Sequence, residues 1–129
     1  MKMKRLDTLI VDDNEAFRQS LHRVLVRHFP FMRVSQAGDG EGALSSVAQR
    51  MPDLIFMDIR MPGKSGLDIL RVIKSVDAHA MICVITSFDL PEYRDAALHS
   101  GADHFIVKSE STEAAIVSIV DGMLSGLAT

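Results

Sequence analysis

Polar side chains suited to binding a metal or a charged ligand follow several short apolar runs in this 129-residue sequence. They supply three carboxylates, hydroxyl groups and one ammonium group. If the runs are parallel strands, their carboxyl ends meet at one edge of a sheet, where open α/β sheets bind ligands. We therefore expect these side chains to form one pocket. In chain order they are Asp12, Asp13, Asp58, Thr86, Ser87 and Lys108.

Three carboxylates on one rim repel one another. Two charges about 5 Å apart at an effective dielectric of about 20 repel by roughly 3 kcal/mol, so the cluster needs a proton or a cation. A set of oxygen ligands favours Mg²⁺ or Mn²⁺. The five histidines show no ligand spacing and the single cysteine, Cys83, lies within an apolar run, so zinc is not expected.

Three features together indicate a phosphoryl-transfer site: a cation bound by carboxylates, a nearby hydroxyl group and a nearby lysine. The cation and Lys108 would neutralise phosphoryl oxygens, Thr86 would donate a hydrogen bond, and one carboxylate would accept the phosphoryl group. Asp58 is the expected acceptor because it stands alone, whereas Asp12 and Asp13 form a pair. Taken singly, each residue could be a helix cap, a strand end or a surface lysine. Their common position after strands favours the site.

The elements that must position these residues are five apolar runs along the chain. Four runs are continuous, which indicates strands covered on both faces. The second run alternates around Met32 and Val34, as a strand near a sheet edge does. The runs occupy residues 8–11, 32–34, 54–57, 81–85 and 105–107.

Helical periodicity fills the segments between the runs. Apolar residues recur at helical spacing within 17–28, 43–51, 70–76 and 115–127. A further helix is predicted to start at Asp89-Leu90-Pro91-Glu92, with Asp89 as its cap, and to end at Ser100-Gly101. Five strands alternating with five helices predict an α/β protein with a parallel sheet and helices on both faces.

The composition excludes several classes of protein. With 47% hydrophobic and 24% charged residues, the chain is expected to be one soluble domain over residues 1–129, with no second domain. A net charge of −3 argues against a nucleic-acid-binding surface, and one cysteine excludes a disulfide framework. No apolar stretch reaches the roughly 20 residues of a membrane span, and no signal-peptide core follows the basic first residues. We therefore expect a cytoplasmic protein without membrane contact.

Four segments of the sequence resemble the receiver domain of two-component response regulators, and the resemblance extends over the whole chain. It implies an α/β, flavodoxin-like, doubly wound fold with five helices and a five-stranded parallel sheet in the order 2-1-3-4-5. The segments are 9–14 for the acidic pair, 52–66 for the phosphorylation loop with its Met61-Pro62 and Gly66, 85–87 for the switch residue, and 101–108 for the block that ends in lysine.

The resemblance implies a role for each acidic residue. Asp58 would accept a phosphoryl group from the phosphohistidine of a sensor histidine kinase and form an acyl phosphate. Asp13 would bind Mg²⁺ (or Mn²⁺) directly and Asp12 largely through water. Asp58 and the backbone carbonyl of Arg60 would complete the protein ligands.

The resemblance also implies a conformational switch. Lys108 would pair with the phosphoryl group, and Thr86, followed by Ser87, would move inward to hydrogen-bond it. Phe105 would respond to phosphorylation by a change in its side-chain packing and not by a hydrogen bond, because its ring carries no hydroxyl. The charge added by phosphorylation would shift the protein from a mostly inactive to a mostly active conformer. The chain is thus expected to be a phosphoacceptor signalling domain rather than an enzyme, although it takes part in its own phosphorylation and dephosphorylation.

Two further expectations concern kinetics and partner choice. Arg60 and Phe88 are both large and stand where they would hinder water from attacking the phosphoryl group, which predicts slow self-dephosphorylation. Exposed residues of the first helix, with Arg18, Gln19 and His22 among them, are expected to contribute to pairing with the kinase.

The output of the domain is left open by the sequence. Ser109 follows the lysine where many receivers have proline, and a Lys-Ser junction is common in regulators with a LuxR-type helix-turn-helix domain. That likeness favours transcription control, with DNA bound only by an output domain absent from this chain; the alternative is a stand-alone receiver. Ala114, Val117 and Gly122 form a second apolar set on the last helix, which either packs on the sheet or forms a homodimer face.

Other functions fit the sequence less well. A phosphatase of the haloacid-dehalogenase type would place its nucleophile after the first strand and its acidic pair late, the reverse of the order here. A flavin-binding module would need a phosphate loop where Asp12-Asp13-Asn14-Glu15 would repel phosphate. A receiver that binds partners without phosphorylation remains an alternative, although all the site residues are present.

Overall fold

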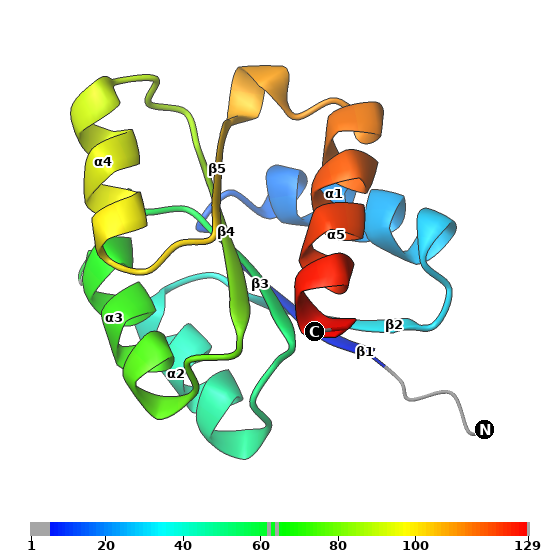
Figure 1. Ribbon diagram of the computed structural model, residues 1–129, viewed down its shortest axis with the longest axis horizontal. Coiled ribbons are helices and arrows are strands. Elements are labelled where there is room, and N and C mark those ends of the chain that lie inside the picture. The colour runs from blue at the N-terminus through cyan, green and yellow to red at the C-terminus, as the bar shows by residue number, and fades with distance from the viewer. Residues whose placement is uncertain (1–5, 62, 64, 129) are drawn as a thin grey trace.

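The computed structural model describes residues 6–61, 63 and 65–128. Pro62 and Lys64 of the expected phosphorylation loop lie outside the described residues. Strands and helices alternate along the chain (Figure 1). The strands are β1 (Leu6–Val11), β2 (Met32–Ala37), β3 (Leu54–Met57), β4 (Met81–Thr86) and β5 (His104–Val107). The helices are α1 (Glu15–His28), α2 (Gly40–Gln49), α3 (Gly66–Val76), α4 (Pro91–His99), the short 3-10 turn η1 (Lys108–Glu110) and α5 (Glu113–Ala128).

The five strands form one parallel sheet in the order β2-β1-β3-β4-β5. The predicted fold class and strand order are therefore confirmed, and so is the edge position expected for β2. β1 pairs with β3, with Val11 opposite Met57. The residues that follow these two strands consequently leave the sheet side by side.

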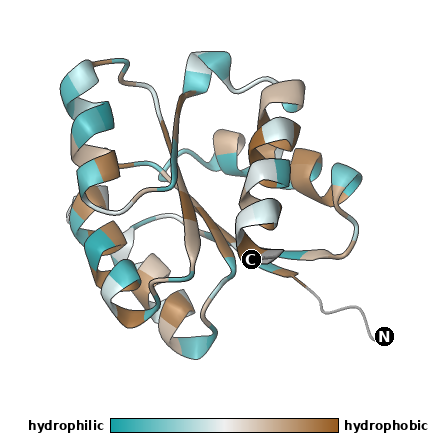
Figure 2. Ribbon diagram, in the orientation of Figure 1, coloured by the Kyte–Doolittle hydropathy of each residue, from teal (hydrophilic) through white to brown (hydrophobic). Residues whose placement is uncertain are grey.

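Helices cover both faces of the sheet. α2, α3 and α4 lie on one side, and α1 and α5 lie on the other (Figure 1). Leu9 and Val11 of β1 pack in the first layer, whereas Ile10 packs in the second. Figure 2 shows the resulting distribution, with hydrophobic central strands and hydrophilic residues on the helices. Over the described part of the chain, no helix is long and apolar enough to cross a membrane.

Side-chain caps fix the starts of α1, α2 and α3. Asn14 accepts a hydrogen bond from the amide of Phe17 at 3.0 Å and begins α1. Asp39 accepts from the amide of Gly42 at 2.7 Å and begins α2. Ser65 caps α3 in the same way. Such caps satisfy amides that have no partner within the helix.

The start predicted for α4 was wrong by one residue. Leu90, not Asp89, is the N-cap of α4, and it makes no side-chain hydrogen bond there. Pro91 occupies the first turn, where its missing N–H costs nothing, so the helix begins without a polar cap. The predicted end is confirmed: Ser100 is the C-cap and Gly101 has φ of 112°, a conformation that favours glycine.

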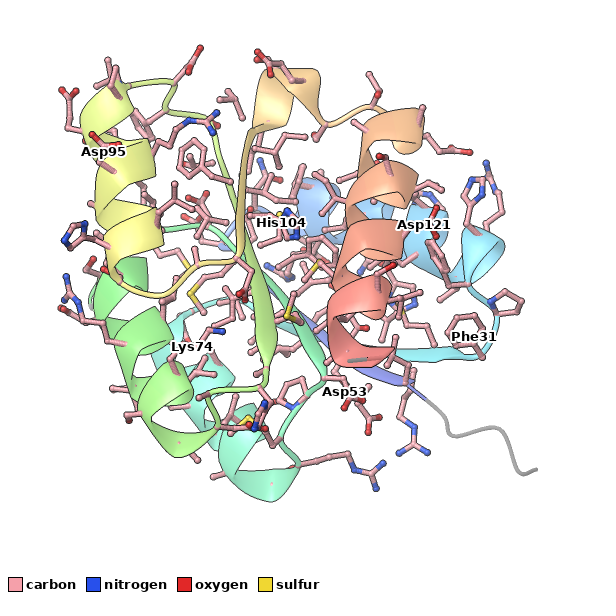
Figure 3. The ribbon with its side chains drawn as sticks, viewed as in Figure 1. Phe31, Asp53, Lys74, Asp95, His104 and Asp121 are labelled. Carbon is pink, nitrogen blue, oxygen red and sulfur yellow. The ribbon has the colours of Figure 1, made fainter. Side chains whose placement is uncertain are left out.

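Lys74 ties α3 to the sheet at the end opposite the acidic residues. Its ammonium donates to the carbonyl of Ala80 at 2.7 Å and pairs with Asp103 at 3.0 Å, and Figure 3 labels it between α3 and β4. Asp103 also accepts from the amide of Ile82 at 2.8 Å. These contacts hold α3, β4 and the start of β5 together.

Candidate functional site

The three predicted carboxylates form one cluster at the carboxyl edge of the sheet. One oxygen from each of Asp12, Asp13 and Asp58 lies within 4.8 Å of the others. Asp12 is 1% exposed and Asp58 is 5% exposed, whereas Asp13 lies open to solvent. The cluster forms because β1 and β3 are adjacent parallel strands that end at the same level. Solvent can therefore reach the cluster from the side of Asp13.

Lys108 brings a positive charge to the two buried carboxylates. Its ammonium lies 2.8 Å from Asp12 Oδ2 and 3.2 Å from Asp58 Oδ2. The lysine begins η1, directly after β5, and the hydroxyl of Ser111 donates to its carbonyl at 2.6 Å. The ammonium also lies 4.5 Å from the centre of the Phe17 ring, at a distance typical of a cation–π contact.

Burial and charge compete in this cluster. Burial raises the pKa of Asp12, and hydrogen bonds from Lys108 and the Asn14 amide, with the charge of Lys108, offset only part of that rise. Burial lowers the pKa of Lys108, but the Asp12 and Asp58 carboxylates outweigh it, so its pKa is raised. Lys108 therefore stays protonated at neutral pH and serves as a fixed cation beside Asp58.

Asp58 is held by the backbone around it. Its amide donates to the carbonyl of Val11 at 2.9 Å, and its Oδ1 accepts from the amide of Arg60 at 2.9 Å. Gly66 passes close to this loop: a Cβ there would lie 2.5 Å from the carbonyl oxygen of Asp58 and from Cα of Ile59. Only glycine lets the start of α3 approach so closely, and this approach fixes the backbone that carries Asp58.

The other predicted site residues do not contact the cluster in this conformation. Thr86 is fully buried, and its hydroxyl accepts a 3.4 Å hydrogen bond from the amide of Phe88. Ser87 is exposed. Phe105 is half-buried against the layer of α2, α3 and α4, with the Arg94 guanidinium 5.0 Å from its ring centre. Among the described residues, none of the three makes a hydrogen bond or ion pair with the carboxylates.

The side chain of Arg60 leans away from the carboxylates toward α4. Its guanidinium lies 4.4 Å from the ring centre of Phe88 and donates to the Tyr93 hydroxyl at 2.7 Å. The two rings also contact each other, with centres 5.6 Å apart. Arg60, Phe88 and Tyr93 thus form a bridge between the loop after β3 and the start of α4, which we call the aromatic bridge. Sequence analysis singled out Arg60 and Phe88 but missed Tyr93.

The first helix differs from what the sequence predicted. Arg18 and His22 are half-buried rather than exposed, and only Gln19 is exposed. Arg18 donates to the backbone carbonyl of Asp12 at 2.6 Å and to the side chain of Gln36 at 3.1 Å, and the Gln36 amide contacts His22 at 3.0 Å. Two of the three residues expected to face a kinase are therefore committed to contacts within the protein.

Comparison with known proteins identifies the family. A sequence model of the response regulator receiver domain matches residues 8–121, which is most of the chain. The chain is 37% identical over 105 residues to the response regulator MprA of Mycobacterium sp. strain KMS, covering 81% of this chain and 45% of that protein. It is 28% identical over 122 residues to the probable transcriptional regulatory protein TcrX of Mycobacterium tuberculosis, covering 91% of this chain and 51% of that protein. The chain thus spans about half the length of the curated relatives it matches.

Solved structures agree with this assignment. A LuxR-family response regulator from Aurantimonas sp. SI85-9A1 superposes with a TM-score of 0.84 at 27% identity, covering 95% of this chain and 87% of that chain. The chemotaxis protein CheY4 of Vibrio cholerae superposes with a TM-score of 0.84 at 22% identity, covering 93% of this chain and 99% of that chain. This likeness is one of fold. The chain belongs to the response regulator receiver domain family, and it is a receiver of the two-component type.

Proposed function

We propose that this receiver domain accepts a phosphoryl group on Asp58, in a reaction that requires Mg²⁺, from the phosphohistidine of a sensor histidine kinase. The observation that carries the proposal is the position of Asp58. It is almost fully buried, it lies 3.2 Å from the Lys108 ammonium, and it shares the 4.8 Å carboxylate cluster with Asp12 and Asp13. A carboxylate placed between a cation and a metal-binding pair is well arranged to receive a phosphoryl group.

The residues present fit a magnesium ion. Oxygen ligands suit Mg²⁺, which keeps several waters and needs few protein ligands. Asp12 Oδ2 is buried, and among the described residues its polar contact is the Lys108 ammonium at 2.8 Å. Asp12, Asp13, Asp58 and the carbonyl of Arg60 would hold the ion. When bound, the ion would neutralise phosphoryl oxygens and reduce repulsion between the phosphoryl group and the carboxylates.

The transfer itself is a substitution at phosphorus. An oxygen of the Asp58 carboxylate forms a bond to phosphorus as the bond from phosphorus to the imidazole nitrogen breaks, and the bonding electrons stay with the imidazole. The product is an acyl phosphate on Asp58 and a free histidine on the kinase. Lys108 contributes its positive charge to the phosphoryl oxygens and positions them. The chain thereby acts as a phosphoacceptor rather than as an enzyme with a separate substrate.

Phosphorylation would change the conformation through Thr86 and Phe105. The Thr86 hydroxyl has only a 3.4 Å hydrogen bond in this conformation, so little is lost when it turns to donate to a phosphoryl oxygen. Ser87 follows it and moves with the same loop. Phe105, half-buried in the layer of α2, α3 and α4, would respond to this movement by changing its packing. Two charge-assisted hydrogen bonds of about 1.5–3 kcal/mol each would be enough to shift the population.

The output of the switch is proposed to be transcription. The curated relatives are about twice as long as this chain, and one of them is named a probable transcriptional regulatory protein. An output domain outside these residues would bind DNA.

Ala114, Val117 and Gly122 offer a surface for a homodimer, because Ala114 and Gly122 are exposed on α5 and Val117 is half-buried. A stand-alone receiver and a binding module that works without phosphorylation are the alternatives. The proposed location is the cytoplasm.

The experiment is an intact-mass measurement after incubation with acetyl phosphate. We expect one added phosphate when Mg²⁺ is present and none when the metal is chelated. Asp58→Asn should stay unmodified in both conditions. An unmodified wild-type protein, also after incubation with an active histidine kinase, would favour the phosphorylation-independent binding module.

A further inference from the structure

Arg18 connects α1 to the backbone of the acidic loop. Its Nη1 donates to the carbonyl oxygen of Asp12 at 2.6 Å. The amide of Asp12 donates to the carbonyl of Ala37 at 3.1 Å. The peptide groups on both sides of Asp12 are thus restrained, one by β2 and the other by Arg18. The carbonyl belongs to the peptide group that leads into Asp13.

The guanidinium is itself held in place. Its Nε donates to Oε1 of Gln36 at 3.1 Å, and Nε2 of Gln36 contacts Nδ1 of His22 at 3.0 Å. The planar fork of arginine can reach Asp12 and Gln36 together, which a lysine ammonium on a flexible stem does less well. Arg18 is half-buried, so these contacts are partly shielded from water.

We propose that Arg18 is a positioning residue of the metal site: by binding the carbonyl of Asp12 it fixes the Asp12–Asp13 peptide and so the direction of the exposed Asp13 carboxylate. This inference rests on the proposed function, which places Mg²⁺ at the cluster. Partners that orient metal ligands typically change metal affinity by 10- to 100-fold when they are removed. Arg18 would thus matter for the metal without touching it.

The sign of the effect separates positioning from simple electrostatics. Arg18 carries a positive charge near a cluster that binds a cation. If it acted only through charge, its removal would strengthen Mg²⁺ binding, because less positive charge would oppose the ion. If it positions the loop, its removal weakens binding, because Asp13 no longer points reliably at the shared site.

The test is a titration of the full chain with Mg²⁺ alone. Binding is monitored through the amide chemical shifts of residues 12–14. We expect Arg18→Ala to weaken Mg²⁺ binding about tenfold. Arg23→Ala is the matched control, because Arg23 is an exposed arginine of the same helix and its loss removes the same charge. The control should bind Mg²⁺ as the wild type does. Unchanged or tighter binding by folded Arg18→Ala overturns the proposal.

A second variant keeps the test decisive if Arg18→Ala does not fold. Gln36→Leu removes the hydrogen bond that orients the guanidinium but leaves the charge of Arg18 in place. We expect it to weaken Mg²⁺ binding by roughly two- to tenfold, the range that one hydrogen bond spans. Wild-type affinity in this variant would count against the inference. If the wild-type chain binds no Mg²⁺, the proposed function fails instead.

Discussion

Lys108 holds two carboxylates that would otherwise repel each other, at 2.8 Å from Asp12 and 3.2 Å from Asp58. Lys108→Met removes the cation and leaves both groups buried. We expect the free energy of unfolding without metal to fall by about 1–3 kcal/mol, less than for a fully buried pair because the Lys108 side chain is 17% exposed. Stabilisation by added Mg²⁺ should be larger than in the wild type, because the ion then supplies the missing charge.

Denaturant unfolding with and without Mg²⁺ measures both effects. Lys74→Met is the matched control, since Lys74 has the same 17% side-chain exposure and pairs with Asp103 away from the cluster. It should lower stability but leave the response to Mg²⁺ as in the wild type. A smaller Mg²⁺ response in Lys108→Met than in the wild type would contradict the assigned role of the lysine.

Cys83 is a second residue whose environment determines its chemistry. It is fully buried within β4, and burial raises the pKa of its thiol from 9.0 to about 12. The thiolate is the reactive form, so we expect the folded protein to react with iodoacetamide only through opened conformations and far more slowly than the unfolded chain at each pH between 7 and 9. The unfolded chain should react much faster over that range. Because the folded pKa lies above the unfolded one, ionisation should reduce stability only above about pH 9. Rapid labelling of the native protein at pH 7 would contradict this burial.

At the scale of elements, α3 is packed onto the loop that carries Asp58. Gly66→Ala would place a Cβ 2.5 Å from the backbone of Asp58 and Ile59, so the loop or the helix must move. We expect a loss of about 1–3 kcal/mol in stability and slower phosphorylation. Gly122→Ala is the control, because the new Cβ would lie 3.8 Å from its nearest neighbour, His104, which is an ordinary contact. Alanine is also more favourable than glycine within a helix. Denaturant unfolding checks both variants, and equal stabilities of the two would be inconsistent with this packing.

The aromatic bridge links the loop after β3 to α4. It places Arg60 and Phe88 in contact at 4.4 Å, beside the acceptor loop. We expect Arg60→Ala to shorten the lifetime of the acyl phosphate by roughly two- to fivefold, because a lost cation–π contact of about 0.5–1 kcal/mol opens a path for water. Tyr93→Phe, which removes only the hydroxyl bonded to Arg60, should have a smaller effect. Loss of phosphate from the intact protein over time measures these lifetimes, and a longer lifetime in Arg60→Ala would refute the shielding role.

For the molecule as a whole, sequence patterns were sufficient for the architecture. Four continuous apolar runs and one alternating run predicted the five strands, and the residues after them predicted that Asp12, Asp13 and Asp58 would meet. These features depend on local periodicity and on the common direction of parallel strands. The strand order came from the resemblance to a known family, and it is confirmed.

Long-range details could not be predicted in the same way. The carbonyl that Arg18 reaches depends on how α1 lies against β1 and β2, so its spacing in the sequence suggested only a surface residue. The start of α4 depended on whether Asp89 or Leu90 took the cap position, and local capping signals favoured the wrong one. Asp39, which follows β2, caps α2 and does not join the carboxylates. Tertiary packing decided the Arg18 contact, whereas the start of α4 followed from Pro91 in its first turn.

The central claim is that Asp58 is the residue that receives the phosphoryl group, and chemical trapping tests it most directly. The protein is phosphorylated with acetyl phosphate and Mg²⁺ and then reduced with borohydride, which converts an acyl phosphate of aspartate to homoserine. Peptide mass spectrometry should find homoserine at position 58, with Asp12 and Asp13 unchanged, and chelation of the metal should abolish the product. Homoserine at position 12 or 13, or an unchanged Asp58 in protein whose intact mass includes phosphate, would contradict the account.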